Sequence, residues 1–302
     1  MLSPAPPFPL RQVRDFSQLI SGGFAFLRRH GRPLYRAILL CCLPPMLVAV
    51  YLLGGATSAF LNLSSGNVEG TSAEHGGYLV IAAFTLIALE MLLLHALVHE
   101  FFRFHDQGRP KSTGLLLGRA LRKSLHYLGI LLLTGLMLTG AVFLCALVFA
   151  LEEPLLNVVA VIGMFATVLA LLAMCSLASA AQALEGKGVA AAMNRSWNLV
   201  RRHFWPTLGL GIVAGLIVLI LGYLVQIIGS IAMVVIMAVG HSPESRAELV
   251  PIIMSVVFGL QFCVQMLAYP IPCTCMMLKY CSRVEEEEGH GLRERIADFG
   301  SL

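Results

Sequence analysis

The sequence predicts an all-α fold: a polytopic membrane helical bundle with six transmembrane helices and cytoplasmic interfacial amphipathic helices. Of its 302 residues, 58% are hydrophobic and 13% are charged, whereas a soluble domain has about 25% charged residues. The mean hydropathy is +0.82, so lipid must cover much of the chain. Long apolar stretches and a one-sided distribution of basic residues complete the prediction.

The apolar stretches are long enough to cross the hydrocarbon core of a bilayer, which takes about 20 helical residues. They extend over residues 37–60, 78–102, 127–151, 156–183, 207–239 and 250–279. The fifth stretch is too long for one perpendicular crossing, and Gly229-Ser230 is where we expect it to bend or leave the bilayer. Proline pairs interrupt the first and sixth stretches, at Pro44-Pro45 and at Pro270 and Pro272, and favour kinks there.

The basic residues set the orientation of the spans. With this assignment, 20 of the 21 Lys and Arg residues lie on one side of the membrane, and only Arg246 lies on the other. Cytoplasmic loops carry the excess of basic residues, so both ends of the chain are predicted in the cytoplasm. We expect residues 1–302 to form a single membrane domain: a cytoplasmic N-terminal amphipathic segment (1–36), the six-span bundle (37–279) and a charged cytoplasmic tail (280–302).

Three cytoplasmic segments resemble one another: Phe26–Leu34, Ala120–Leu128 and Leu199–Thr207. Each joins basic residues to the start of a span, which suggests an interfacial helix followed by a two-span hairpin, used three times. Convergence on the basic and aromatic residues that flank cytoplasmic span ends is the alternative.

The interfacial helices should rest on anionic headgroups through their cations. In the first, Val13, Phe16, Ile20, Phe24 and Leu27 recur at helical spacing. In the third, Met193, Trp197 and Val200 form the apolar face. The candidate lipid-surface contacts are Arg14, Arg28, Arg29, Arg122, Lys123, Arg195, Arg201 and Arg202.

Glu90 lies in the middle of the second span and is the ionisable residue nearest a span centre. Such residues usually face the bundle interior or a wet cavity. Gln261 and Gln265 lie one turn apart at similar depth in the sixth span and are candidate partners. Glu90 is therefore either a protonated structural residue hydrogen-bonded to a neighbouring helix, or a proton or cation site.

His95 and His99 are four residues apart and share a helix face, which is compatible with zinc binding. However, HALVHE lacks the residue order of the metalloprotease motif HExxH, and Glu90 points to another face. We interpret these histidines as interfacial residues beside basic, lipid-facing side chains, with no metal and no cofactor. Nucleotide-binding and hydrolase motifs are missing from the sequence, and the acidic run Glu285–Glu288 is interpreted as a solvated helix face.

The two ends of the chain, Arg11–Leu34 and Tyr280–Gly300, resemble a family of uncharacterised bacterial six-span inner-membrane proteins. Residues Ala191–Pro206, AAMNRSWNLVRRHFWP, are loosely similar to the interfacial helix of a membrane domain attached to some glycerophosphodiester phosphodiesterases. The resemblance implies the bacterial inner membrane and supplies no catalytic residues.

These observations favour a non-enzymatic inner-membrane protein that acts as a scaffold or as a subunit of a membrane assembly. The alternative is a small-solute or ion transporter that uses Glu90, and a membrane-embedded enzyme comes third. The expected partners are the lipid bilayer with its anionic headgroups and a membrane protein or second copy of the chain, and no nucleic acid is expected.

Overall fold

The computed structural model describes residues 8–64, 71–108, 112–150, 153–238 and 243–289, and all regular secondary structure in these ranges is helical. The helices are α1 (Phe16–His30), α2 (Arg32–Ser64), α3 (Thr71–Asp106), α4 (Thr113–Phe149), α5 (Pro154–Glu185), α6 (Val189–Val200), α7 (Phe204–Ala238), α8 (Pro243–Ala268) and α9 (Pro270–Glu288). Six segments are long and apolar enough to cross a membrane: Arg32–Ala59, His75–Asp106, Thr113–Phe149, Pro154–Glu185, Phe204–Val235 and Ile252–Glu288. The predicted fold class is confirmed.

The prolines and glycines act differently in different spans. The sixth predicted span consists of two helices, because α8 ends at Ala268 and α9 begins at Pro270. In contrast, α2 continues through Pro44 and Pro45. Helix α7 also runs unbroken through Gly229-Ser230. Gly229 instead permits close packing against α8, since a Cβ atom there would lie 2.4 Å from Val257.

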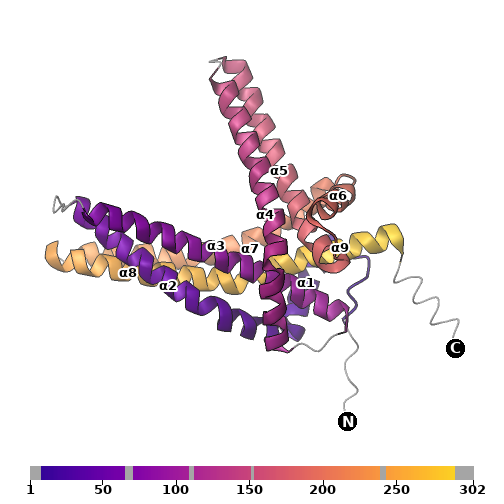
Figure 1. The fold of residues 1–302 in the computed structure, drawn as a ribbon, viewed down its shortest axis with the longest axis horizontal. Helices are drawn as coiled ribbons and strands as arrows, with labels where there is room; N and C mark the ends of the chain where they lie inside the picture. Colours follow the sequence, from indigo (N-terminus) through magenta and orange to yellow (C-terminus); the bar gives the residue numbers. More distant parts are fainter. Residues whose placement is uncertain (1–7, 65–70, 109–111, 151–152, 239–242, 290–302) are drawn as a thin grey trace, which may run out of the picture.

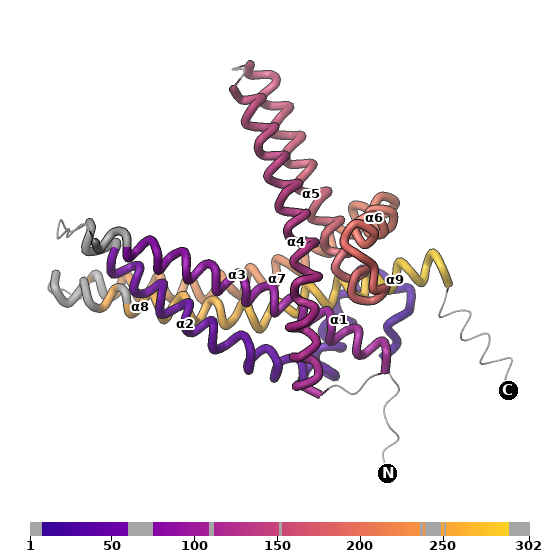
Figure 2. Tube along the Cα trace, viewed as in Figure 1, coloured from indigo at the N-terminus to yellow at the C-terminus, as the bar shows by residue number. Residues whose placement is uncertain are grey.

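The spans form two bodies that diverge from a common base (Figure 1). Helices α2, α3, α7 and α8 run side by side as a four-helix bundle, in which α2 packs on α3 and α8, and α8 packs on α7. Helices α4 and α5 pack on each other and leave the bundle at a steep angle, as the chain trace shows (Figure 2). The sequence did not predict this fork.

The hydrophobic core lies at the base, where α1, α6 and α9 meet the ends of the spans. Phe26 of α1 is fully buried. Its ring stacks on Phe102 with centroids 4.4 Å apart and meets Phe101 and His105 edge-on. All four predicted cytoplasmic segments start or end at this base (Figure 1), so the structure groups them together; which side of the membrane they face stays a prediction.

Helix α1 begins with a capping box. The Asp15 carboxylate accepts hydrogen bonds from the backbone N–H of Gln18 at 2.8 Å and the hydroxyl of Ser17 at 2.9 Å, and these bonds lower the pKa of Asp15. Helix α1 buries Leu19, Gly23, Phe26 and Leu27, whereas Val13, Phe16 and Phe24 of the predicted stripe are exposed. The predicted stripe is thus largely exposed and shares only Leu27 with the face that packs on the protein; its contact with the headgroup layer stays a prediction.

The proposed repeat is reproduced unevenly. Helix α1 ends just before α2, and residues 201–203 separate α6 from α7, as the repeat requires. The second copy differs, because Ala120–Leu128 lies inside α4, which continues without a break from Thr113. A separate interfacial helix in that copy was a wrong prediction. In α6, Met193 and Val200 are buried, while Trp197 is exposed.

Candidate functional site

A cavity of about 340 Å³ lies at the fork, where α5 leaves the bundle and meets α3, α7 and the junction of α8 with α9. We call it the fork cavity; the residues that line it include His95, His99, Ser179, Gly211, Tyr269 and Cys273. Most of the remaining lining is apolar. Leu172 of α5 and Ile212 of α7 also line the cavity and are 58% and 48% exposed. The cavity therefore opens at a surface that belongs to two membrane spans.

The polar part of the lining is centred on the imidazole of His95. Its Nδ1 lies 2.7 Å from the hydroxyl of Tyr269, and its Nε2 lies 2.9 Å from the Oγ of Ser179. A neutral imidazole donates through one nitrogen and accepts through the other. Both nitrogens of His95 are therefore engaged, and the residue links α3 to α5 and to the start of α9.

His99 is oriented by the backbone of its own helix. It is only 3% exposed, and its Nδ1 lies 2.8 Å from the carbonyl oxygen of His95. Because a carbonyl oxygen can only accept, Nδ1 must carry the hydrogen, and Nε2 must be an acceptor. Among the described residues, no hydrogen bond to Nε2 is found. This buried side chain thus brings an unused acceptor to the cavity wall.

A paired carboxylate, that of Glu100, follows His99 on α3. Glu100 is 1% exposed and accepts a hydrogen bond of 3.2 Å from the hydroxyl of Tyr127. Arg103 and Arg119 lie 3.7 and 3.6 Å from its oxygens. Two cations next to a buried carboxylate offset the cost of its desolvation. The Tyr127 ring contacts both histidine rings, with centroids 5.4–5.6 Å apart.

The interpretation of His95 and His99 as interfacial residues beside basic, lipid-facing side chains was wrong. Their imidazoles pack 4.1 Å apart between centroids, inside the base of the bundle. His95 uses both nitrogens on Tyr269 and Ser179, which removes it from any chelating pair with His99. Sequence reasoning missed Ser179 and Tyr269 altogether, and the only signal for Tyr269 was its position directly before Pro270.

The structure gives the predicted polar trio different surroundings. Glu90 is only 4% exposed and lies close to the thiols of Cys42 and Cys263. Gln261 and Gln265 instead approach Gly222 of α7, at 3.7 and 3.3 Å from the position of an added Cβ. On a helix with 3.6 residues per turn, Cys263 lies opposite these two glutamines. No hydrogen bond between Glu90 and either glutamine is found in the described part of the chain.

The eight candidate lipid-surface cations fall into two groups. All eight are exposed or half-exposed, and for six of them lipid contact stays a prediction: Arg28, Arg29, Arg122, Lys123, Arg201 and Arg202. Arg14 is instead turned onto the chain, where it donates to the carbonyl oxygens of Leu10 and Pro9 and lies over the ring of Phe8. These contacts occupy part of its guanidinium, and its contact with lipid stays a prediction.

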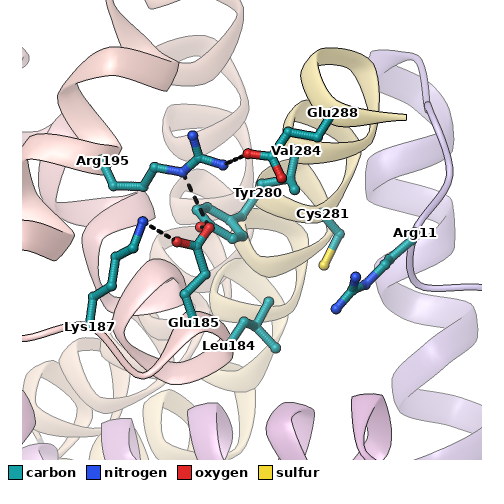
Figure 3. A pocket seen from close by; sticks show the side chains of 9 residues that line it. All are labelled: Arg11, Leu184, Glu185, Lys187, Arg195, Tyr280, Cys281, Val284 and Glu288. Carbon is teal, nitrogen blue, oxygen red and sulfur yellow. Dashed lines mark hydrogen bonds and ion pairs between the residues drawn. The ribbon is translucent and has the colours of Figure 1, made fainter. Parts of the chain in front are cut away.

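Arg195 is the second exception, and it forms the centre of an ion-pair cluster that joins α5, α6 and α9 (Figure 3). Its guanidinium contacts Glu185 at 3.2 Å and also Glu288. Glu185 further binds Lys187 at 2.6 Å and the hydroxyl of Tyr280. Burial alone lowers the pKa of Arg195, but the bonds to Glu288 and Tyr280 and the charge of Glu185 raise it above its ordinary value.

The cluster corrects two predictions. Arg195 points to carboxylates and not to lipid phosphate, because Glu185 and Glu288 come within bonding distance when α6 folds back on α5 and α9. The acidic run Glu285–Glu288 is not purely a solvated face either, since Glu288 binds Arg195 and Glu286 binds Arg283.

The chain belongs to a family that is described as a domain of unknown function, DUF7847, whose model matches residues 17–270. The predicted resemblance to an uncharacterised membrane family agrees with this match and with the six apolar helices. The match gives no link to the glycerophosphodiester phosphodiesterases, so that likeness stays a prediction. Searches of curated proteins and of solved structures gave no significant match.

Proposed function

We propose that this chain is a non-enzymatic scaffold, or a subunit of a larger membrane assembly, in the bacterial inner membrane. In this proposal, the four-helix bundle with its packed base is the body, and the α4–α5 hairpin is an arm that binds a membrane-protein partner or a second copy of the chain. The observation that carries the proposal is the divergence of the hairpin from the bundle (Figure 1).

The surface of the hairpin beyond the fork supports this role. Leu136, Phe143 and Leu144 of α4 and Ile162 and Phe165 of α5 are all exposed. Small residues let the backbones of membrane helices approach one another closely. The hairpin has such positions at Gly135, Gly140 and Gly163, where an added Cβ would find no atom within 4 Å.

An enzymatic role has less support, although Ser179 and His95 are spaced like a nucleophile and its base. Acyl transfer also needs donors directed at a developing oxyanion. The three other hydroxyls of the fork cavity are already engaged: Ser176 donates to the carbonyl of Ala173, Thr207 donates to that of His203, and Tyr269 bonds to His95. We expect a serine-directed fluorophosphonate probe to leave Ser179 unlabelled.

The alternative function, a transporter that uses Glu90, also has less support. The carboxylate is buried among α2, α3 and α8, and the fork cavity, which is the membrane-level opening described above, does not include it. A transport site usually combines polar groups from several spans around one wet cavity. Glu90 instead lies near the thiols of Cys42 and Cys263.

Site-specific photo-crosslinking in native membranes tests the scaffold proposal. A photoreactive amino acid at Leu144 samples the arm, and the same group at Leu40 of α2, which is equally exposed, is the matched control. We expect a discrete protein adduct from Leu144 and only lipid adducts from Leu40. Gly140→Leu should abolish the adduct by blocking close approach. Lipid adducts alone at both positions would contradict the proposal.

A further inference from the structure

We propose that the fork cavity binds an uncharged amphiphile with a hydroxyl head group, such as a diacylglycerol, which enters from the bilayer between α5 and α7. This inference goes beyond the scaffold role and does not depend on it. The site is built from the hydrogen-bonding groups of the cavity wall, the shape of α7 above it, and the charge of its lining.

The direction of the hydrogen-bond chain leaves a donor in the cavity. His95 bonds to the hydroxyl of Tyr269 through Nδ1 and to the hydroxyl of Ser179 through Nε2. We assign the imidazole hydrogen to Nε2, so that Tyr269 donates to Nδ1 and Nε2–H donates to Ser179. The hydroxyl hydrogen of Ser179 then remains free to donate to a ligand.

The acceptor is supplied by His99. Its Nδ1–H donates to the carbonyl of His95, which leaves Nε2 with a free lone pair. His99 is nevertheless only 3% exposed. A ligand hydroxyl satisfies both groups at once, because it can accept from Ser179 and donate to His99.

The charge of the lining selects a neutral head group. None of the described residues that line the fork cavity is Asp, Glu, Lys or Arg. The nearby carboxylate of Glu100 is already paired with Arg103 and Arg119. A phosphate or an ammonium would therefore be desolvated without a counter-charge, which is strongly unfavourable. A carboxylate would also lack the hydrogen that His99 requires.

The surface of α7 provides a path for the acyl chain. Gly211 lines the cavity, and Gly215 lies one turn further from the base on the same face. An added Cβ at either position would find no atom within 4 Å. The helix therefore presents a smooth, side-chain-free track that leads from the polar wall toward the middle of the bilayer, next to the exposed rim residues Leu172 and Ile212.

The test uses the full chain in nanodiscs of phosphatidylcholine, with photoactivatable probes that share the same acyl chains and differ in their heads. We expect the diacylglycerol probe to label peptides of α5 and α7 and to be competed by unlabelled diacylglycerol. The matching phosphatidic acid, fatty acid and phosphatidylcholine probes should label these peptides at least tenfold less. Equal labelling by a charged probe, or preferential labelling by the fatty acid, would overturn the proposal.

A matched pair of serine variants on α5 tests the polar contact. Ser179→Ala removes the free donor and should weaken binding about tenfold, whereas Ser176→Ala removes a hydroxyl already bonded to Ala173 and should change binding less than about twofold. Equal losses in the two variants would contradict the assigned donor.

A third variant separates binding from folding. Gly211→Leu fills the track without touching a hydrogen bond, so it should abolish labelling while the melting temperature of the ligand-free protein stays that of the wild type. Unchanged labelling of this variant would contradict the proposed path.

Discussion

The base of the molecule and the α4–α5 hairpin are both rich in apolar side chains, but they differ in what covers these side chains. At the base, aromatic rings from α1 and α3 interlock around Phe26. On the hairpin, Leu and Phe residues of similar hydropathy face outward. Hydropathy therefore identifies the segments that enter a membrane, whereas interlocking aromatic and polar side chains mark where the protein packs on itself.

The largest expected difference between the two regions comes from one aromatic deletion in each. Phe26→Ala should reduce the free energy of unfolding by about 3–5 kcal/mol, because a fully buried ring is lost and a cavity is left. Phe143→Ala on the exposed face of α4 should change it by less than about 1 kcal/mol, since lipid replaces the ring. Unfolding in mild detergent, followed by circular dichroism, measures both; equal losses would remove the distinction between base and arm.

A smaller effect is expected from the ion-pair cluster that closes the base. Arg195→Ala leaves Glu288 and Glu185 without their guanidinium partner, and hydrogen bonds to charged groups contribute about 1.5–3 kcal/mol. We expect a loss of that order, together with faster proteolysis in α6. Arg202→Ala, at an exposed cation in the connection between α6 and α7, serves as the control and should have no measurable effect on unfolding.

The smallest effect is expected at Glu90, within the bundle. Glu90→Gln should change the free energy of unfolding by less than about 1 kcal/mol, because a protonated carboxyl and an amide both donate and accept hydrogen bonds. Proton and cation flux into liposomes should be the same for both proteins. If the wild type shows flux and the variant does not, the transporter hypothesis is supported and the description of the bundle as packed is contradicted.

The sequence predicted the spans well because hydropathy averages over about 20 residues and tolerates local errors. It could not predict which helices are neighbours. Gln261 and Gln265 match Glu90 in depth, but the rotation of α8 turns them to Gly222 and brings Cys263 toward Glu90. Depth follows from chain position, whereas rotation depends on packing against several partners at once.

The fork cavity shows the same contrast between what chain position predicts and what packing decides. His95 and His99 were recognised as sharing one face, and helical periodicity alone gives that result. Their partners Ser179 and Tyr269 come from residues 84 and 174 positions away along the chain, which no local pattern connects. The Asp15–Gln18 capping box is the opposite case: its spacing is visible in the sequence and could have located the start of α1.

The central claim is that the hairpin diverges from the bundle, and a spin-label distance tests it most directly. Labels at Leu155 of α5 and Tyr78 of α3, both exposed near the ends of their helices that lie away from the base, report the opening of the fork. Tyr78 with Ile252 of α8 gives a reference within the bundle. In nanodiscs we predict a Leu155–Tyr78 distance that is clearly longer than the reference. Packed helix axes lie about 8–10 Å apart, so a distance of about 20 Å or less would mean a closed six-helix bundle and would contradict the fork.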